Sequence, residues 1–153
     1  MKFSDLDIIG DIHGHYDELI KLLYLLGYRD VNGCWRHPTR KILFLGDFID
    51  RGKKQVEVVK LVMDMVFHDQ AYCVLGNHEL NACAMITDNP YNPQDKLRTI
   101  LGKKGEDNLK QHQSFIDQCS AYPGIRQEFC NFFLKLPLWV EGENWRAVHA
   151  CWH

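Results

Sequence analysis

Three short loops carry the residues in this sequence that can do chemistry together. Each loop follows an apolar run, begins with glycine and contains potential metal ligands: Gly10-Asp11-Ile12-His13-Gly14, Gly46-Asp47-Phe48-Ile49-Asp50-Arg51-Gly52 and Gly76-Asn77-His78-Glu79. A fourth apolar run, Ala147 to Ala150, contains His149. Carboxylate, amide and imidazole groups bind divalent cations, and glycine permits the tight turns that bring such groups together. We therefore predict one metal site assembled from several loops.

The ligand types are consistent with two ions. Asp11 and His13 offer an oxygen and a nitrogen to a first ion, and the Asp47 carboxylate is able to bridge two ions. Asn77 and His149 can bind the second ion. Oxygen and nitrogen ligands without thiolate favour catalytic Mn²⁺, our leading expectation, or Fe or Zn²⁺, over a structural zinc. Two ions about 3.5–4 Å apart can hold a bridging hydroxide that attacks a phosphate.

Three further residues fit the hydrolysis of a phosphoester. The Arg51 guanidinium, which comes shortly after Asp47, can bind a phosphoryl group through two parallel N–H donors. His78 can protonate the leaving oxygen, and Asp50 can fix the orientation of its ring. Taken singly, Asp and Asn after a strand also form turns, and Asp50 with Arg51 can be a surface ion pair of little consequence. Their combination within the same loops favours a site.

Apolar periodicity predicts the elements that position these loops. Strands are expected over residues 6–10, 41–45, 71–75, 138–141 and 145–150. Helices are expected over residues 17–26, 55–67, 80–85, 108–121 and 125–134. Because ligands of open α/β sheets bind beyond the carboxyl ends of the strands, the three loops should converge. Residues 88–107 are polar and contain prolines and glycines, which indicates a surface excursion or lid that we extend to residue 126.

Composition limits the class of function. The 153 residues carry 18 Lys and Arg against 20 Asp and Glu, for a formal net charge of −2, which suits one soluble domain. This balance argues against a main task of binding nucleic acid or anionic lipid. No apolar run approaches the roughly 18 residues of a membrane span, and acids occupy the place of a signal peptide's apolar stretch. We expect a cytoplasmic protein with no membrane or nucleic-acid partner.

Side chains outside the loops have ordinary structural interpretations. The six cysteines form no CxxC pair, so we expect reduced, buried thiols. Surface positions are expected for the histidines outside the loops: His15, His37, His68 and His112. Core positions, rather than a platform for stacking bases, are expected for six aromatic residues: Phe129, Phe132, Phe133, Trp139, Trp145 and Trp152. A solvated face, with attraction of an anionic substrate as the alternative, is expected for the basic cluster Lys96, Arg98, Lys103 and Lys104.

The motifs GDIHG, GDFIDRG, GNHE and VHA, in this order, resemble those of the calcineurin-like metallophosphoesterases. The resemblance is specifically to PPP-type serine/threonine phosphatases and symmetrical diadenosine tetraphosphate hydrolases, and it covers residues 7–152. It implies an α/β fold in which two mixed sheets form a β-sandwich flanked by helices. It also implies a set of metal ligands: Asp11, His13, Asp47, Asn77 and His149. Phosphate binding is implied for Arg51, and an acid pair for His78 and Asp50.

The sequence departs from the family after its last motif. The family has a further histidine ligand well beyond the VHA motif, and PPP-type phosphatases have a second phosphate-binding arginine there. This sequence ends four residues after His149, and His153 does not match the position of the missing ligand. We therefore expect residues 1–153 to be the N-terminal portion of a metallophosphoesterase domain, with a second ion held more weakly than the first.

Three functions follow from the motifs. The first is hydrolysis of phosphate monoesters, phosphoserine and phosphothreonine of proteins included, by attack of a metal-bridging hydroxide. The second is symmetrical hydrolysis of dinucleoside polyphosphates. The third is metal binding without catalysis by an incomplete site. The expected partner is a phosphorylated substrate, either a phosphoprotein or a nucleotide, and the motifs do not divide the two.

Overall fold

The structure is a computed structural model that describes residues 5–151. Trp152 and His153 lie outside the described residues, so the expectations for them are not addressed. Helices and strands follow one another in this order: β1 (Leu6–Ile9), α1 (Tyr16–Leu25), β2 (Arg29–Val31), β3 (Cys34–Arg36), β4 (Lys41–Phe44), α2 (Gln55–Phe67), β5 (Ala71–Cys73), α3 (Asn77–Ala84), β6 (Asp88–Asn89), β7 (Asn92–Lys96), α4 (Gly102–Ser120), α5 (Ile125–Phe133), β8 (Trp139–Glu141) and β9 (Arg146–Val148).

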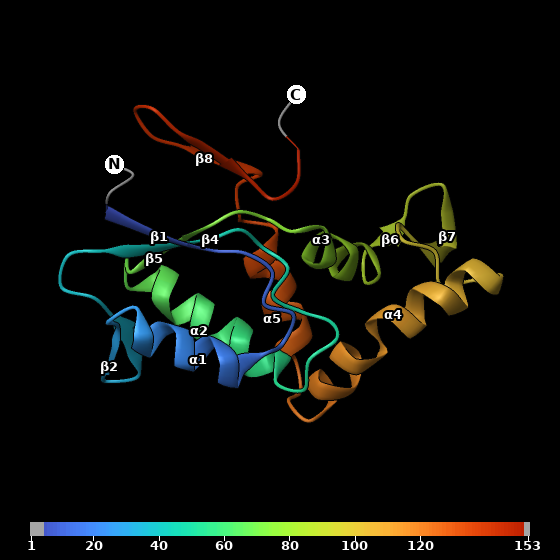
Figure 1. Ribbon diagram of the computed structural model, residues 1–153. Coiled ribbons are helices and arrows are strands. Elements are labelled where there is room, and N and C mark those ends of the chain that lie inside the picture. The colour runs from blue at the N-terminus through green and yellow to red at the C-terminus, as the bar shows by residue number, and fades with distance from the viewer. Residues whose placement is uncertain (1–4, 152–153) are drawn as a thin grey trace.

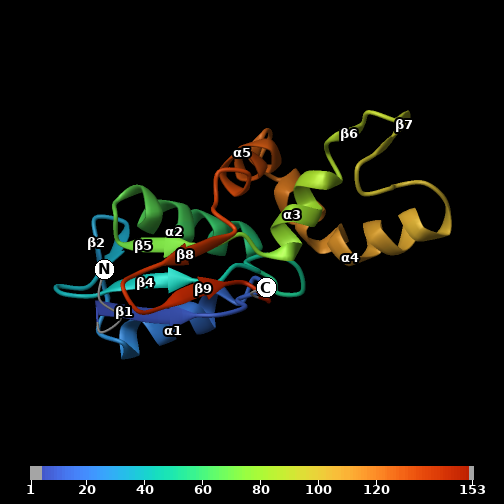
Figure 2. The ribbon, with the colours of Figure 1, turned by 90° about the horizontal axis from the view of Figure 1, so that it is seen from above.

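A parallel sheet in the order β1-β4-β5 forms the centre of the fold. Its register places Ile8 beside Leu43 and Phe44 beside Cys73. Helices α1 and α2 lie against one face, and the β8–β9 hairpin lies over the other (Figures 1 and 2). Apolar side chains of the sheet and of α2 are buried between these layers, among them Ile9, Ile42, Phe44, Val58, Val62 and Met65. The predicted mixed α/β architecture is confirmed.

The three central strands end at Ile9, Phe44 and Cys73, one or two residues before the predicted ends and shortly before the three loops. Because all three strands run in the same direction, their carboxyl ends lie at one edge of the sheet. The helix over residues 55–67 is also confirmed, and its apolar face packs on the sheet. The sequence therefore predicted the frame of the site correctly.

Two helices begin earlier than predicted. Helix α3 begins at Asn77 instead of residue 80, so Asn77 and His78 lie in its first turn. Helix α4 begins at Gly102 instead of residue 108. The glycines at positions 102 and 105 led to the prediction of a turn instead of a helix. A Cβ at Gly105 would overlap the backbone of Ile100, so this glycine allows close packing within the structure.

Residues 88–107 contain regular structure rather than an irregular excursion. Strands β6 and β7 form a short antiparallel hairpin, and α4 follows it. Hairpin and helix extend to one side of the parallel sheet (Figures 1 and 2). The role of residues 88–126 as a lid, and the boundaries of the domain, remain predictions.

Burial confirms most expectations for side chains and corrects one for an aromatic residue. All six cysteines are free, and all but Cys151 are buried. Phe129 and Phe133 are fully buried, but Trp139 is 50% exposed, so its expected core position is wrong. Trp139 begins β8, a strand of mostly exposed residues, and it lines a cavity instead of the core. No helix among residues 5–151 is long and apolar enough to cross a membrane.

Backbone hydrogen bonds join the first and second loops. The amides of Ile12 and His13 donate to the Asp47 carbonyl, at 3.0 and 2.9 Å, and the Gly52 amide donates to the His13 carbonyl at 2.7 Å. A Cβ at Gly52 would overlap the backbone of His13 and Gly14. The glycine at this position is therefore required for the two loops to approach each other.

We expect Gly52→Ala to lower the free energy of unfolding by about 1–3 kcal/mol, because rigid backbone must move to admit the methyl group. Gly10→Ala is the matched control: Gly10 begins the first loop, and a Cβ there meets nothing within 4 Å among the described residues. Its effect should stay within about 0.5 kcal/mol. Urea denaturation of both variants measures the difference, and equal losses would contradict the close packing of the loops.

Candidate metal centre

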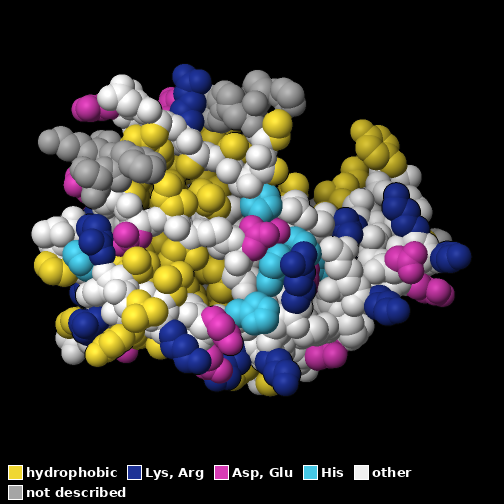
Figure 3. Space-filling view, viewed as in Figure 1, with side chains coloured by type: hydrophobic (Ala, Val, Ile, Leu, Met, Phe, Trp, Pro, Cys, Tyr) yellow, Lys and Arg dark blue, Asp and Glu magenta, His cyan; other side chains and the backbone are white. Residues whose placement is uncertain are grey.

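Histidine and acidic side chains gather near the middle of one face of the molecule, with Lys or Arg side chains beside them (Figure 3). They come from the loops after β1, β4 and β5 and from the residue after β9. The structure thus brings together the predicted ligands Asp11, His13, Asp47, Asn77 and His149. Their roles as ligands remain predictions.

Three histidines are oriented in the same way. His13 Nδ1 bonds the Ile49 carbonyl at 2.7 Å, and His149 Nδ1 bonds the Leu45 carbonyl at 2.7 Å. Since a carbonyl only accepts, each Nδ1 carries the hydrogen and each Nε2 keeps a lone pair. His78 Nδ1 likewise donates to the Asp50 carboxylate at 2.5 Å. In every case Nε2 is the nitrogen left to face the site, as in metal centres whose ligands are held by a second hydrogen bond.

The Asp47 carboxylate lies between these rings. Its Oδ2 is 3.8 Å from both His13 Nε2 and His78 Nε2, and its Oδ1 is 3.4 Å from His149 Nε2. Oδ1 also accepts the backbone amide of His78 at 3.1 Å. Asp47 is buried, so little water competes for its oxygens. A single carboxylate therefore has one oxygen on each side of the cluster.

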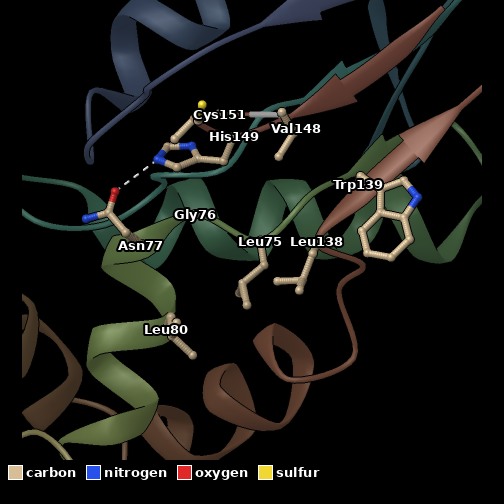
Figure 4. Close-up of a pocket in the computed structure, with 10 residues that line it drawn as sticks. Leu75, Gly76, Asn77, Leu80, Leu138, Trp139, Val148, His149 and Cys151 are labelled. Carbon is tan, nitrogen blue, oxygen red and sulfur yellow. Dashed lines mark hydrogen bonds between the residues drawn. The ribbon is translucent and has the colours of Figure 1, made fainter. Parts of the chain in front are cut away.

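The remaining predicted ligands flank Asp47. Asp11 is more exposed, and its Oδ2 lies 3.6 Å from His13 Nε2. Asn77 Oδ1 lies 3.0 Å from His149 Nε2 (Figure 4). Beside this pair is a cavity of about 540 Å³ with largely apolar walls, which include Leu80, Leu138 and Trp139. The predicted metal ligands Asn77 and His149 therefore lie next to a largely apolar cavity.

These residues fit divalent cations. Two overlapping groups have ligand atoms within 4.8 Å of one another: His13 with Asp47 and His78, and Asp11 with Asp47 and His149. Asp47 belongs to both groups, as a bridging carboxylate would. His13 Nε2 is buried and makes no hydrogen bond to any described residue, and an unprotonated imidazole nitrogen in that state suits a metal. This grouping places Asp11 with His149, while Asp11 Oδ2 also lies 3.6 Å from His13 Nε2, the residue that the sequence assigned to the same ion.

Glu79 supports the second loop from below, and sequence reasoning missed it. Its carboxylate accepts the backbone amides of Asp47 at 2.8 Å and Phe48 at 2.7 Å, and it is fully buried. Burial raises the pKa of Glu79 to about 7, although the two backbone donors oppose that shift. The only sequence signal was the acidic residue at the end of the third loop, in the first turn of α3.

Asp50 is shared by two histidines. Its carboxylate accepts from His78 Nδ1 and, at 2.8–2.9 Å, from His112 Nδ1. His112 is 1% exposed, so its expected surface position is wrong. The missed signal was its spacing: His112 lies on the buried face of α4 with Asn108, Phe115 and Cys119. Arg51, next to Asp50, is exposed.

The loops hold four of these residues in left-handed backbone conformations. His13, Asp47, Asp50 and Arg51 have φ values of 46°, 55°, 68° and 71°. Such values are uncommon outside glycine and persist where surrounding contacts enforce them. Here the enforcing contacts are the loop-to-loop hydrogen bonds and the Glu79 carboxylate. The conformation turns the side chains of one short loop in different directions.

Glu79→Gln should lower the free energy of unfolding by roughly 1–3 kcal/mol, because the new NH₂ group must face a buried backbone N–H and leaves it without an acceptor. Glu128→Gln is the matched control, since Glu128 is also an acid in the first turn of a helix but is exposed. Urea denaturation of both variants gives the comparison. Glu79 would have no supporting role if the two variants lost equal stability.

Relatives of known family are similar to this chain over nearly all of its length. A family model described as calcineurin-like phosphoesterase matches residues 5–150. The asymmetrical bis(5'-nucleosyl)-tetraphosphatase PrpE of Geobacillus sp. is 47% identical over 151 residues, which cover 95% of this chain and 56% of that protein. The protein of the same name from Oceanobacillus iheyensis is 38% identical over 152 residues, with 95% and 54% covered. The chain spans about half the length of these curated relatives.

A solved structure shares the fold. The metallophosphoesterase from Sphaerobacter thermophilus superposes with a TM-score of 0.55 at 21% identity, covering 92% of this chain and 44% of that one. The predicted fold class is therefore supported independently of the motifs. From the match over residues 5–150 and the His and Asp groups that can hold a metal, we conclude that this chain belongs to the calcineurin-like phosphoesterase family of metal-dependent hydrolases.

Proposed function

We propose that this chain carries the metal-binding part of a hydrolase that cleaves dinucleoside polyphosphates. The observation that carries the proposal is the position of Asp47 in both ligand groups, beside a cavity large and apolar enough for a nucleoside. The relatives named asymmetrical bis(5'-nucleosyl)-tetraphosphatases support cleavage at an asymmetrical position, in place of the symmetrical cleavage that the motifs first suggested.

Five residues would hold two divalent ions: Asp11, His13, Asp47, Asn77 and His149. The set is oxygen and nitrogen only, which suits Mn²⁺, Fe or Zn²⁺, with Mn²⁺ as our choice. When bound, such a pair of ions supplies an activated water and neutralises charge on the attacked phosphate. The protein supplies the fixed positions of the side chains, through the Nδ1 hydrogen bonds of His13 and His149.

The remaining site residues would act on the phosphate and the leaving group. Arg51 would bind a phosphoryl oxygen through its guanidinium. His78, oriented by its bond to Asp50, would present Nε2 toward the leaving oxygen and donate a proton to it. The nucleoside would lie in the cavity bounded by Leu80 and Trp139. Among these side chains, His78 has its ring fixed by the hydrogen bond to Asp50.

Phosphate monoester hydrolysis is the second candidate, and the buried His78–Asp50 pair favours it. An alkoxide leaving group requires a proton from the enzyme. A nucleotide phosphate leaves as a stable anion, so its departure depends less on protonation. An acid held this firmly is therefore most useful for an ester. Phosphoproteins are one source of such esters.

Asp47→Asn should remove more than one equivalent of bound Mn²⁺. The amide is neutral and has one oxygen, so it cannot offer a negatively charged oxygen to each of two ions as the carboxylate can. Asparagine tolerates the left-handed backbone and keeps an oxygen for the His78 amide, so the loop should persist. Asp64→Asn, an exposed carboxylate on α2, is the control and should retain full metal content. Calorimetric titration and elemental analysis measure both. Loss of a single equivalent of Mn²⁺, with the other metal position intact, would contradict the sharing of the Asp47 carboxylate by two ions.

The Mn²⁺-loaded 153-residue chain should release AMP and ATP from diadenosine tetraphosphate, and Asp47→Asn should abolish the products. Chromatography of the nucleotides distinguishes this from symmetrical cleavage, which yields ADP alone. Release of phosphate from a phosphoserine peptide, with no nucleotide product, would replace the proposal by the second candidate. Tight metal binding without turnover of either substrate would indicate a metal-binding part that is not catalytic by itself.

A further inference from the structure

Three polar side chains of helix α4 form hydrogen bonds to the second loop and to Gln55, the first residue of α2. Gln118 Oε1 accepts the backbone amide of Gln55 at 2.7 Å, and its Nε2 donates to the Gly52 carbonyl at 3.1 Å. Ser114 accepts a bond from the Gln55 side chain at 3.0 Å. His112, nearly two turns before Gln118 on the same helix, reaches the Asp50 carboxylate. The loop that carries Asp50, one member of the expected acid pair, is therefore anchored to a helix that contains none of the family motifs.

The three side chains His78, Asp50 and His112 form one buried chain of hydrogen bonds. His78 Nδ1 donates to Asp50 Oδ2 at 2.5 Å, and His112 Nδ1 lies 2.9 Å from Asp50 Oδ1 and 2.8 Å from Oδ2, so the two histidines together engage both carboxylate oxygens. All three residues are at least nine-tenths buried. The rings of His78 and His112 are 6.2 Å apart with their planes at 70°. With both of its oxygens engaged, the carboxylate cannot rotate without losing a bond. The direction of the His78 ring therefore depends on the donor at residue 112.

We propose that His112 is a positioning residue: it fixes the Asp50 carboxylate and, through it, the His78 ring that donates the proton to the leaving group. The proposal rests on the proposed role of His78 as the acid. The polar contacts of His112 are made to the Asp50 carboxylate and to none of the five predicted ligands, so its proposed action passes through that carboxylate. The chain thus extends the acid pair to a set of three residues.

Packing alone does not account for a histidine at this position. Phe115 and Cys119 fill the same face of α4 with apolar side chains, and Nε2 of His112 is buried without a hydrogen bond to any described residue. A buried polar atom left unpaired costs free energy, so leucine would serve a purely structural role at least as well. The histidine is explained by the bond that its other nitrogen makes to Asp50.

The test compares three variants. His112→Leu removes the donor and keeps an apolar side chain on the buried face. His112→Asn places an amide N–H near the position of Nδ1 and should restore the bond. Phe115→Leu, on the same face of α4, is the control for loosened packing, because Phe115 is buried among apolar side chains and packs on Phe129.

The first readout needs no turnover. In the 153-residue chain with ¹⁵N-labelled histidine, the Nδ1 proton of His78 should resonate far downfield, because it lies in a short bond to a carboxylate. His112→Leu should shift and broaden this resonance, whereas His112→Asn and Phe115→Leu should leave it in place. An unchanged resonance in His112→Leu would overturn the proposal.

The second readout is the dependence on the leaving group. His112→Leu should lower kcat by about 10-fold or more for phenyl phosphate and by less for p-nitrophenyl phosphate, whose leaving group needs less protonation. Phe115→Leu should change both rates by the same factor. Equal losses in His112→Leu would overturn the positioning role. If the parent chain turns over neither aryl phosphate, the second candidate function fails, and the His78 resonance still decides whether His112 positions the ring.

Discussion

The site depends on the Glu79 carboxylate, which accepts the backbone amides at the start of the second loop. Two N–H groups that would otherwise point into the protein interior without a partner are satisfied by one buried side chain. This allows the chain to turn directly after β4 and hold Asp47 in a left-handed conformation. Asp47 then presents one oxygen toward His13 and the other toward His149. The shared carboxylate follows from this turn, and the turn follows from Glu79.

The same loop is held from two other directions. The first loop donates two backbone amides to the Asp47 carbonyl, and α4 bonds Asp50, Gly52 and Gln55. Residues in left-handed conformations are stable here because several elements enforce them together, and no single contact could do so. These bonds fix the backbone of the loops that carry the site residues, which is the condition for precise placement of ligands.

Sequence reasoning predicted those site residues that can be recognised from residue type and spacing. Asp11, Asp47 and Asn77 each follow a buried strand, so parallel pairing of the strands brings them to one edge. Glu79 and His112 were missed because their importance lies in backbone amides and in a partner 62 residues away, which no local pattern encodes. The position of His112 on a stripe with Asn108 and Phe115 did indicate burial. What it contacts there required the fold.

The hydrogen bonds that anchor α4 restrict how much of residues 88–126, the predicted lid, could move. The half of α4 that contains His112, Ser114 and Gln118 is bonded to the second loop, so moving it would break bonds to residues next to the site. The half that begins at Gly102 and the β6–β7 hairpin are tied mainly to one another and to α3, through Arg98 and its bonds to Asn81 and Gln111. Closure over a substrate would therefore be confined to this outer part, because the inner half of α4 belongs to the frame that holds the acid in place.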